Sequence, residues 1–186
     1  MNPPVTVLLV RHGRTLLNAE GRLRGLANPE LDETGVEQAH AVGKALASRH
    51  LTKVLSSPLH RAATTAEAIA AESGLTNTVD PAFNDRDYGP WTGHIKDEVI
   101  KEFGSVDAAP GVEDLSVVLE RAKPALNALA EGGDSDVIAV VTHDAVIRPI
   151  LEWIQPGIEA EVENGSWAEI SWDGDSWKVL SVDNTA

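Results

Sequence analysis

The pattern of apolar and polar positions first marks three short segments as strands. Val5–Val10 is almost purely apolar, Lys53–Ser56 is a shorter segment of the same kind, and Asp136–Thr142 is the most hydrophobic of the three. Strands that are buried on both faces of a parallel sheet have this near-continuous apolar character. The three segments are therefore predicted to form the centre of a parallel sheet.

Between and after these strands, apolar residues recur at helical spacing. In the first such segment Asp32 is placed to cap a helix whose apolar positions fall on one face, namely Val36, Ala39, Val42, Ala45 and Leu46. Ser57-Pro58 has the composition of a helix start, and Gly74 that of a helix end. Thr76–Pro90 is punctuated by proline and glycine and is predicted as a loop. The predicted helices are Glu33–Arg49, Ser57–Ser73, His94–Phe103, Glu113–Glu131 with a kink at Pro124, and Asp144–Trp153.

The C-terminal part of the chain changes to a period of two. Ser166–Trp172 and Ser176–Asp183 flank Asp173-Gly174-Asp175, which favours a β-hairpin with Trp172 facing Trp177. Strands alternating with helices and followed by a hairpin predict an α/β fold. We expect a three-layer α/β/α sandwich, a single domain over residues 1–186, with a mostly parallel central sheet and the hairpin at its edge.

Composition and charge narrow the classes of function. The chain has 186 residues, a formal net charge of −14 and no cysteine. The absence of cysteine excludes disulfides, cysteine nucleophiles and thiolate metal sites. The acidic balance disfavours nucleic acids and anionic membranes as partners, and the apolar runs are too short to span a bilayer. A cytoplasmic location is expected.

The charge is unevenly distributed along the chain. Residues 1–61 hold eight basic and five acidic residues, whereas residues 62–186 hold seven basic and 24 acidic residues. Arginines concentrated near the start of an otherwise acidic chain are typical of a local anion site, although each one taken singly is more often a solvated surface residue.

Two histidines and two arginines are predicted to meet at one edge of the sheet. Arg11 and His12 directly follow the first predicted strand, and His143 directly follows the last buried one. The carboxyl ends of parallel strands line a common crevice. Arg61 lies in the first turn of the helix after the second strand, at the same edge. His40, His50, His60 and His94 lie on predicted helices or loops without such a pattern.

This set of side chains suits phosphoryl transfer. Arginine grips phosphate oxygens with a rigid fork of donors and opposes the charge that develops during transfer. A neutral imidazole nitrogen is a competent nucleophile for phosphorus, and a second histidine can donate to the phosphoryl oxygens. The constellation predicts a phosphohistidine mechanism without metal or cofactor. Phosphate-binding loops of nucleotide enzymes, dinucleotide fingerprints, serine-hydrolase elbows and zinc-binding histidine pairs are absent from the sequence.

Five ordered motifs resemble those of the histidine phosphatase superfamily, the phosphoglycerate-mutase-like proteins. The segments are LVRHGRTLLN at 9–18, LDETG at 31–35, SSPLHRA and TTAE at 56–67, DRDYGPWTG at 85–93, and VVTH at 140–143. The resemblance runs from residue 8 to about residue 150 and implies the family's α/β sandwich fold.

The resemblance also implies residue roles. His12 would be the phosphorylated nucleophile, and Arg11, Arg61 and His143 would complete the phosphate pocket. Asn18 would add a polar contact, and Arg14, Arg24 and Arg86 would contact the substrate. The acid of the fourth motif would first protonate the leaving group and then activate water.

Two departures from the family pattern concern the proton donor. The usual glutamate is Asp85 in this chain, which is one methylene shorter. His143 is followed by Asp144 in place of glycine, and in the acid phosphatase branch a His-Asp pair supplies the proton. Asp144 is therefore a rival acid, although it equally suits the N-cap of the following helix.

Three functions remain open at this stage. The sequence favours a phosphomonoesterase that acts on a small phosphorylated metabolite, as a monomer or a homodimer. A phosphoglycerate mutase is the alternative, but Ile95–Asp114, the region where mutases carry segments that keep water out, is short. A phosphate-binding protein without turnover is the third.

Overall fold

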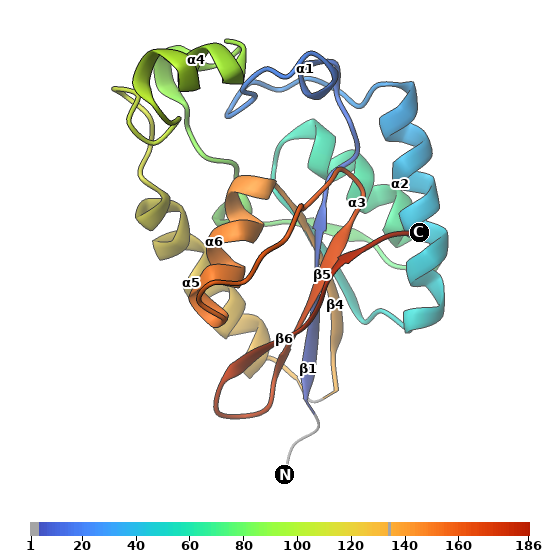
Figure 1. The fold of residues 1–186 in the computed structure, drawn as a ribbon. Helices are drawn as coiled ribbons and strands as arrows, with labels where there is room; N and C mark the ends of the chain where they lie inside the picture. The colour runs from blue at the N-terminus through green and yellow to red at the C-terminus, as the bar shows by residue number, and fades with distance from the viewer. Residues whose placement is uncertain (1–3, 134) are drawn as a thin grey trace.

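The computed structural model describes residues 4–133 and 135–186. Six strands form one sheet in the order β3-β2-β4-β1-β5-β6 (Figure 1). The first four run parallel, and β5 and β6 are each antiparallel to their neighbour. The strands are β1 (Val5–Arg11), β2 (Lys53–Ser56), β3 (Asn77–Val79), β4 (Val137–Thr142), β5 (Trp167–Trp172) and β6 (Trp177–Asn184).

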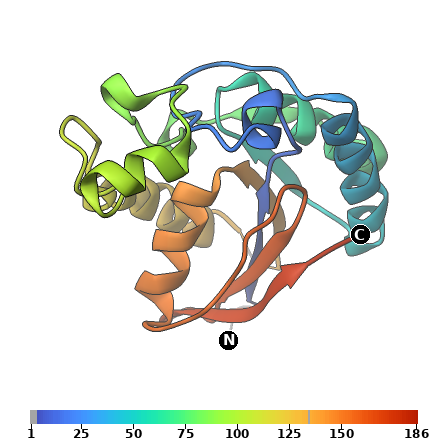
Figure 2. The same ribbon diagram turned by 45° about the horizontal axis from the view of Figure 1, so that its top comes forward.

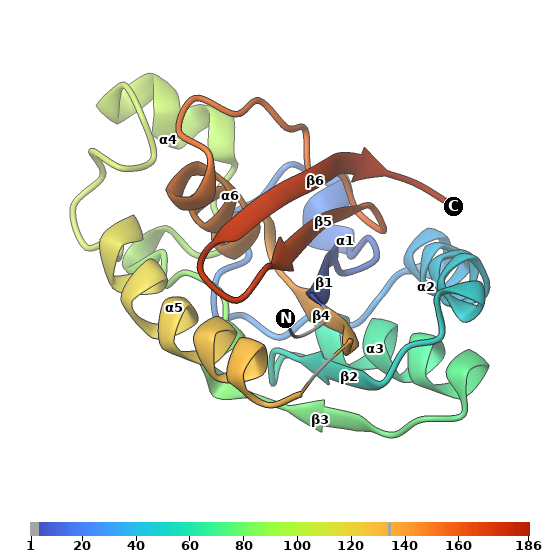
Figure 3. The same cartoon turned by 90° about the horizontal axis from the view of Figure 1, so that it is seen from below.

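Helices cover both faces of the sheet, as seen from below in Figure 3. The pair α2 (Glu33–Leu46) and α3 (His60–Ser73) packs on one face, and the pair α5 (Leu115–Glu131) and α6 (Asp144–Ile154) packs on the other. The short helix α1 (Leu16–Ala19) and α4 (Lys96–Phe103) lie beyond the carboxyl ends of the parallel strands (Figures 1 and 2). Single 3-10 turns occur at Ala47–Arg49, Pro81–Phe83 and Gly89–Trp91. The three-layer α/β prediction is confirmed.

The central strands divide the core into two layers because their side chains alternate between the faces of the sheet. Val7 and Leu9 of β1 enter the cluster beneath α5 and α6, whereas Leu8 and Val10 enter the cluster beneath α2 and α3. All four side chains are fully buried. The double burial explains the uninterrupted apolar character of this strand. No helix in the described ranges has the combined length and hydrophobicity that crossing a bilayer requires.

The C-terminal hairpin forms at the edge of the sheet, as predicted. Trp172 pairs with Trp177 and Ile170 pairs with Val179, and the two indole rings are 5.5 Å apart at a tilt of 60°. The hairpin joins the sheet through β5, which is antiparallel to β1.

Several sequence predictions differ from the structure in detail. Asn77–Val79 lies within the predicted loop but forms the edge strand β3, held by pairing with β2. Helix α3 begins at His60, with Leu59 rather than Ser57 as its cap. The Ser57 hydroxyl accepts from the Leu59 amide at 3.2 Å and lies 2.8 Å from His143 Nε2. It therefore links the turn before α3 to the His143 side chain.

Two glycines permit the loop after β1 to touch the start of α2. A Cβ atom at Gly13 would lie 2.4 Å from the Gly35 carbonyl oxygen, and one at Gly35 would lie 2.0 Å from the Arg14 carbonyl oxygen. Both distances are far below van der Waals contact, and in each case the obstacle is backbone, which cannot rotate away. This close approach fixes the chain immediately after His12 against helix α2.

We expect Gly35→Ala to lower the free energy of unfolding by about 1–3 kcal/mol, the usual cost of overpacking. Gly132→Ala is the matched control, because the nearest obstacle to a Cβ atom there, the Ala128 carbonyl oxygen, would lie 3.4 Å away. Urea unfolding of both variants measures the difference. Equal stability of the two variants would show that the loop after β1 moves freely away from α2.

Candidate active site

The predicted site residues meet at the carboxyl ends of three parallel strands. His12 directly follows β1, His143 directly follows β4, and Arg61 is the second residue of α3, after β2. The His12 and His143 rings are 5.1 Å apart between centroids, and all three side chains are fully buried. The convergence expected from strand order is therefore present in the fold.

His12 is held in one tautomer by its own loop. Its Nδ1 lies 2.7 Å from the Gly13 carbonyl oxygen, which can only accept, so Nδ1 carries the proton. Nε2 is then the nitrogen with the free lone pair. This nitrogen is buried and has no hydrogen-bond partner within the described residues.

Burial and neighbouring cations keep both histidines neutral. The pKa of His12 lies well below its usual value because of burial, with His143, Arg61 and Arg11 acting in the same direction. Burial, followed by Arg61 and Arg24, likewise holds the pKa of His143 well below its usual value. A neutral imidazole is the form that attacks phosphorus.

The last quarter of the chain secures the backbone that carries His12. The Arg11 amide donates to the Ser166 carbonyl at 2.9 Å, and the Asn164 side-chain amide donates to the His12 carbonyl at 3.1 Å. The Arg11 guanidinium donates through Nη1 to the Val162 carbonyl at 2.7 Å. The segment 162–166, just before β5, thus holds Arg11 and His12 in place.

Arg61 is anchored from one side and paired from the other. Its Nη1 donates to the Ala27 carbonyl and its Nη2 to the Gly25 carbonyl, both at 2.7 Å. Nη2 also donates to Asp85 Oδ2 at 2.8 Å, in an ion pair whose side chains are 0% and 2% exposed. The carbonyl anchors fix the guanidinium, so it can exchange one anionic partner for another without moving far.

Asp85 has the protonation behaviour of a general acid. Burial raises its pKa to about 6, although the Arg61 charge opposes this shift. Its Oδ2 lies 3.4 Å from His143 Nδ1. A phosphoryl group bound to Arg61 would offset the guanidinium charge beside Asp85 and would bring a negative charge near the carboxyl group. Both changes would raise the pKa of Asp85 further. The Asp85 side chain, although shorter than a glutamate, still reaches Arg61 and His143.

Arg121 of α5 fastens the loop that carries Asp85. Its Nη2 donates to the Asn84 carbonyl at 3.1 Å and to the Asp85 carbonyl at 2.7 Å, while Nη1 pairs with Glu113 at 3.2 Å. Because these bonds hold the backbone on either side of the carboxyl group, Arg121 acts as a positioning residue for Asp85.

We expect Arg121→Met to lower kcat for alkyl phosphates about 10- to 100-fold, the cost of a misplacement on the scale of 1 Å. The rate for p-nitrophenyl phosphate, whose leaving group needs little protonation, should fall much less. Lys123→Met is the control, since Lys123 lies on the same helix and packs over Trp153. Equal losses on both esters would contradict a role through Asp85.

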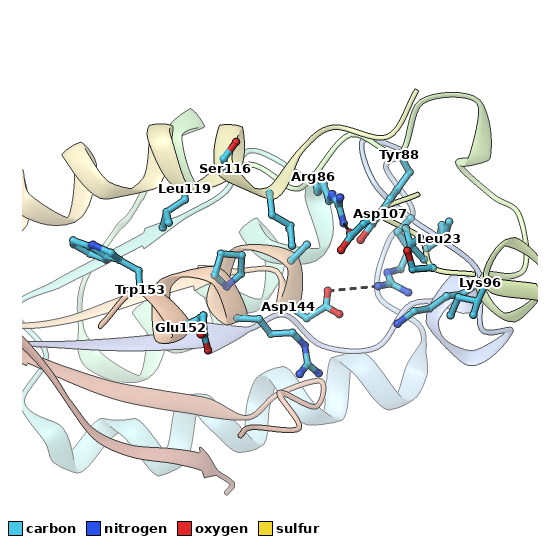
Figure 4. Close-up of a pocket in the computed structure, with 18 of the residues that line it drawn as sticks. Leu23, Arg86, Tyr88, Lys96, Asp107, Ser116, Leu119, Asp144, Glu152 and Trp153 are labelled. Carbon is cyan, nitrogen blue, oxygen red and sulfur yellow. Dashed lines mark ion pairs between the residues drawn. The ribbon is translucent and has the colours of Figure 1, made fainter. Parts of the chain in front are cut away.

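Asp144 lies beside the pocket but remains ionised. The predicted N-cap role is wrong, because α6 starts at Asp144 and its cap is His143. Burial raises the pKa of Asp144, but the Arg11 and Arg24 charges outweigh it and hold the pKa at about 2. Asp144 Oδ1 is 3.6 Å from an Arg24 nitrogen (Figure 4). A carboxylate with this pKa has no proton to give near neutral pH.

The remaining side chains predicted to contact the substrate have different surroundings. Arg24 and Arg86 line a groove next to the site. Asn18 accepts from the Thr15 amide at 3.0 Å and from its hydroxyl at 2.9 Å, capping α1. Arg14 pairs with Asp32 at 2.7 Å and has a side chain 41% exposed, so it is engaged with the start of α2.

Two polar side chains that the sequence did not single out support the site. The Thr65 hydroxyl accepts from the Gly13 amide at 3.0 Å and donates to the Arg61 carbonyl at 2.8 Å, linking the two loops. The Ser57 hydroxyl accepts from the Leu59 amide and forms a 2.8 Å hydrogen bond with His143 Nε2, which orients the His143 ring. In the described part of the chain, no group of three or more His, Asp or Glu side chains is arranged as metal ligands.

The arrangement joins a buried neutral imidazole, fixed cations and a carboxyl group with a pKa of about 6. Because the His12 ring is fully buried, a phosphate ester reaches it only when neighbouring side chains move. The anion would replace Asp85 at Arg61, leaving the carboxyl group free to donate a proton. These are the components of phosphoryl transfer through histidine.

Comparisons with known proteins agree with this chemistry. The model of the histidine phosphatase superfamily (branch 1) matches residues 7–185. Phosphoglycerate mutase-like protein 4 of Arabidopsis thaliana is 32% identical, covering 93% of this chain and 82% of that protein. Phosphoserine phosphatase 1 of Hydrogenobacter thermophilus is 30% identical, covering 77% of this chain and 73% of that protein. A solved phosphoglycerate mutase from Bacillus anthracis superimposes with a TM-score of 0.89 at 26% identity, covering 98% of this chain and 94% of that structure.

Proposed function

The chain belongs to the histidine phosphatase superfamily and is a phosphatase of that superfamily, and on this premise we propose that it hydrolyses small phosphate monoesters through a covalent phosphohistidine on His12, without a metal ion. Asp85 serves as general acid and then as general base. The single observation that carries the proposal is the fixed tautomer of His12, whose Nε2 is buried without a partner among the described residues, in a ring 5.1 Å from that of His143.

In the first step the phosphoryl oxygens bind to Arg11, Arg61 and His143, and the Arg61–Asp85 ion pair opens. Nε2 of His12 forms a bond to phosphorus while the bond from phosphorus to the ester oxygen breaks. The proton of Asp85 passes to that oxygen, so the alcohol leaves neutral. The arginines offset the charge on the transferring group.

In the second step a water molecule attacks the phosphohistidine. Asp85, now ionised, removes a proton from the water as the new P–O bond forms and the P–N bond breaks. Inorganic phosphate leaves, and both His12 and Asp85 return to their starting states. One carboxyl group serves both directions because a pKa of about 6 lies close to neutral pH.

Hydrolysis is favoured over mutase activity by the space beside the site. A cavity of about 690 Å³ with Arg24, Arg86 and Asp144 in its wall borders the pocket. A mutase must exclude water from its phosphoenzyme, whereas a phosphatase must admit it. The Arg86 and Tyr88 side chains of the mutase-like loop lie in the same wall and are in cation–π contact at 5.7 Å.

The proposal includes a cytoplasmic location, action as one domain in a monomer or homodimer, and a small phosphorylated metabolite as substrate. The formal charge of −14 supports a small substrate over nucleic acids and other polyanions. Cell fractionation and sedimentation would test location and assembly.

Two assays test the activity itself. The protein is incubated with p-nitrophenyl phosphate with and without EDTA, and separately with 3-phosphoglycerate plus 2,3-bisphosphoglycerate. We expect phosphate release that EDTA does not inhibit, and no appreciable exchange between phosphoglycerate isomers. Efficient isomer exchange would instead establish the mutase alternative. No activity in either assay or on a panel of phosphate esters would indicate a phosphate-binding protein without turnover.

A further inference from the structure

A groove of about 690 Å³ leads away from the phosphate pocket between α4, α5 and α6 (Figure 4). This volume lies well inside the range of about 300–1,000 Å³ that is typical of small-molecule sites. The phosphoryl group is already provided for by Arg11, Arg61 and the two histidines, none of which lines the groove. The groove is therefore additional to the catalytic pocket.

The groove adjoins the site through residues that directly follow the proposed catalytic side chains in the sequence. Asp144 follows His143 and Arg86 follows Asp85, and both lie in the groove wall. Arg24 pairs with Asp144 at the boundary, as the dashed line in Figure 4 shows. An alcohol esterified to a phosphoryl group on His12 would extend into this space.

The part of the groove between α5 and α6 is lined mostly by apolar side chains, with Ser116 and Glu152 as the polar ones. Leu115 and Leu119 of α5 and Pro149 and Trp153 of α6 contribute to it, and Figure 4 shows Leu119 near Trp153. Ile100 of α4 adds to the lining from the third helix. Such a surface gains free energy by removing apolar ligand surface from water.

Most charged side chains in the groove wall are already engaged. Arg24 pairs with Asp144, and Arg86 pairs with Asp107 at 2.7 Å. Arg148 donates to the Ala160 carbonyl at 2.7 Å. A second phosphate or a carboxylate on the substrate would have to compete with these partners. Among the described residues of the wall, only the Lys96 side chain of α4 is a cation without an ion pair or hydrogen bond, so one such position does not favour polyanionic alcohols in general.

We propose that the groove binds the alcohol part of the substrate and selects phosphate monoesters with an extended apolar alcohol over those of short, acidic or polyhydroxylated ones. This inference rests on the proposed phosphatase function, since it assigns the other half of the same substrate. The phosphoryl group provides the common anchor, and apolar contact along α4, α5 and α6 provides the selection.

The n-alkyl phosphates from ethyl to octyl test the proposal, because their alcohols differ little in acidity and so in intrinsic reactivity. We expect kcat/KM to rise with chain length by up to about fourfold for each methylene that becomes buried. Glycerol phosphate and 3-phosphoglycerate should fall near the short end of the series. A series that is flat in chain length would overturn the proposal.

Ile100→Gln and Leu115→Gln place a polar group in the groove at positions outside the buried core clusters. Their loss of kcat/KM should grow with the alkyl chain, to about tenfold or more for octyl phosphate. Val117→Gln is the matched control, because Val117 lies on α5, is 43% exposed and is not part of the groove wall. The same loss for every chain length in the groove variants would contradict the assignment.

Binding of n-alkylphosphonates, which cannot be hydrolysed, separates this proposal from the catalytic one. Calorimetry on the wild-type protein should show affinity that increases with chain length and a weaker increase in Leu115→Gln. If the phosphonates bind in this way but no ester is turned over, the proposed function fails and the groove assignment stands. If esters are hydrolysed and all phosphonates bind equally, the groove assignment fails alone.

Discussion

Replacement of His12 by alanine is expected to lower kcat for p-nitrophenyl phosphate by at least about 10⁴-fold, the scale on which enzymes that form covalent intermediates lose activity without their nucleophile. The physical reason is that His12 Nε2 keeps a free lone pair, since Nδ1 is committed to the Gly13 carbonyl. The His143 ring is engaged on both sides, because its Nε2 is hydrogen-bonded to Ser57 and its Nδ1 lies 3.4 Å from Asp85 Oδ2.

A trapping experiment gives the same prediction a second readout. The wild-type protein, quenched during turnover of a ³²P-labelled ester, should carry label that survives alkali and is lost in acid, as a phosphoramidate does. His12→Ala should carry none. His40→Ala is the matched control, since His40 is exposed on α2, and it should label and turn over normally. Persistent labelling of His12→Ala would place the nucleophile elsewhere.

Replacement of Asp85 by asparagine is the second large effect. Turnover of alkyl phosphates should fall about 10²- to 10⁴-fold, the range of general acid–base catalysis. Activated aryl esters should be affected less in the first step, because their leaving groups depart without a proton. Asp144→Asn should have a smaller effect on this comparison, because its carboxyl group, with a pKa of about 2, is already ionised.

The pH profile follows from the same pKa. Asp85 donates only when protonated, and the proportion that is protonated falls about tenfold per pH unit above a pKa of about 6. The ratio of kcat/KM for butyl phosphate to that for p-nitrophenyl phosphate should therefore decline as pH rises from 6 to 8. Using the ratio largely cancels the ionisation of the phosphate group itself. In Asp85→Asn the ratio should be independent of pH, and a persisting decline would point to another acid.

Strand order alone predicted which side chains of the proposed phosphate pocket lie together. Residues that directly follow parallel strands share one edge whatever their separation along the chain, so His12, His143 and Arg61 could be placed without knowing any loop. The register of the hairpin could be predicted from the length of the turn between Trp172 and Trp177.

What the sequence did not predict depends on contacts between remote loops. Arg121 reaches the carbonyls of Asn84 and Asp85 only because α5 packs beside their loop, and no local pattern records this. Strand β3 has three residues and a half-exposed Val79, so its conformation comes from pairing with β2 rather than from its own composition. The sequence around Asp144 is typical of a helix N-cap, but the charges of Arg24 and Arg11, which come from another part of the chain, lower the pKa of its carboxyl group.

The bonds from segment 162–166 to Arg11 and His12 also bear on when the site is completed during synthesis. His12 leaves the ribosome about 150 residues before the segment that holds its backbone. A nascent chain that ends before residue 162 therefore lacks these bonds to Arg11 and His12, and the full support of the site arrives only with the segment that leads into β5.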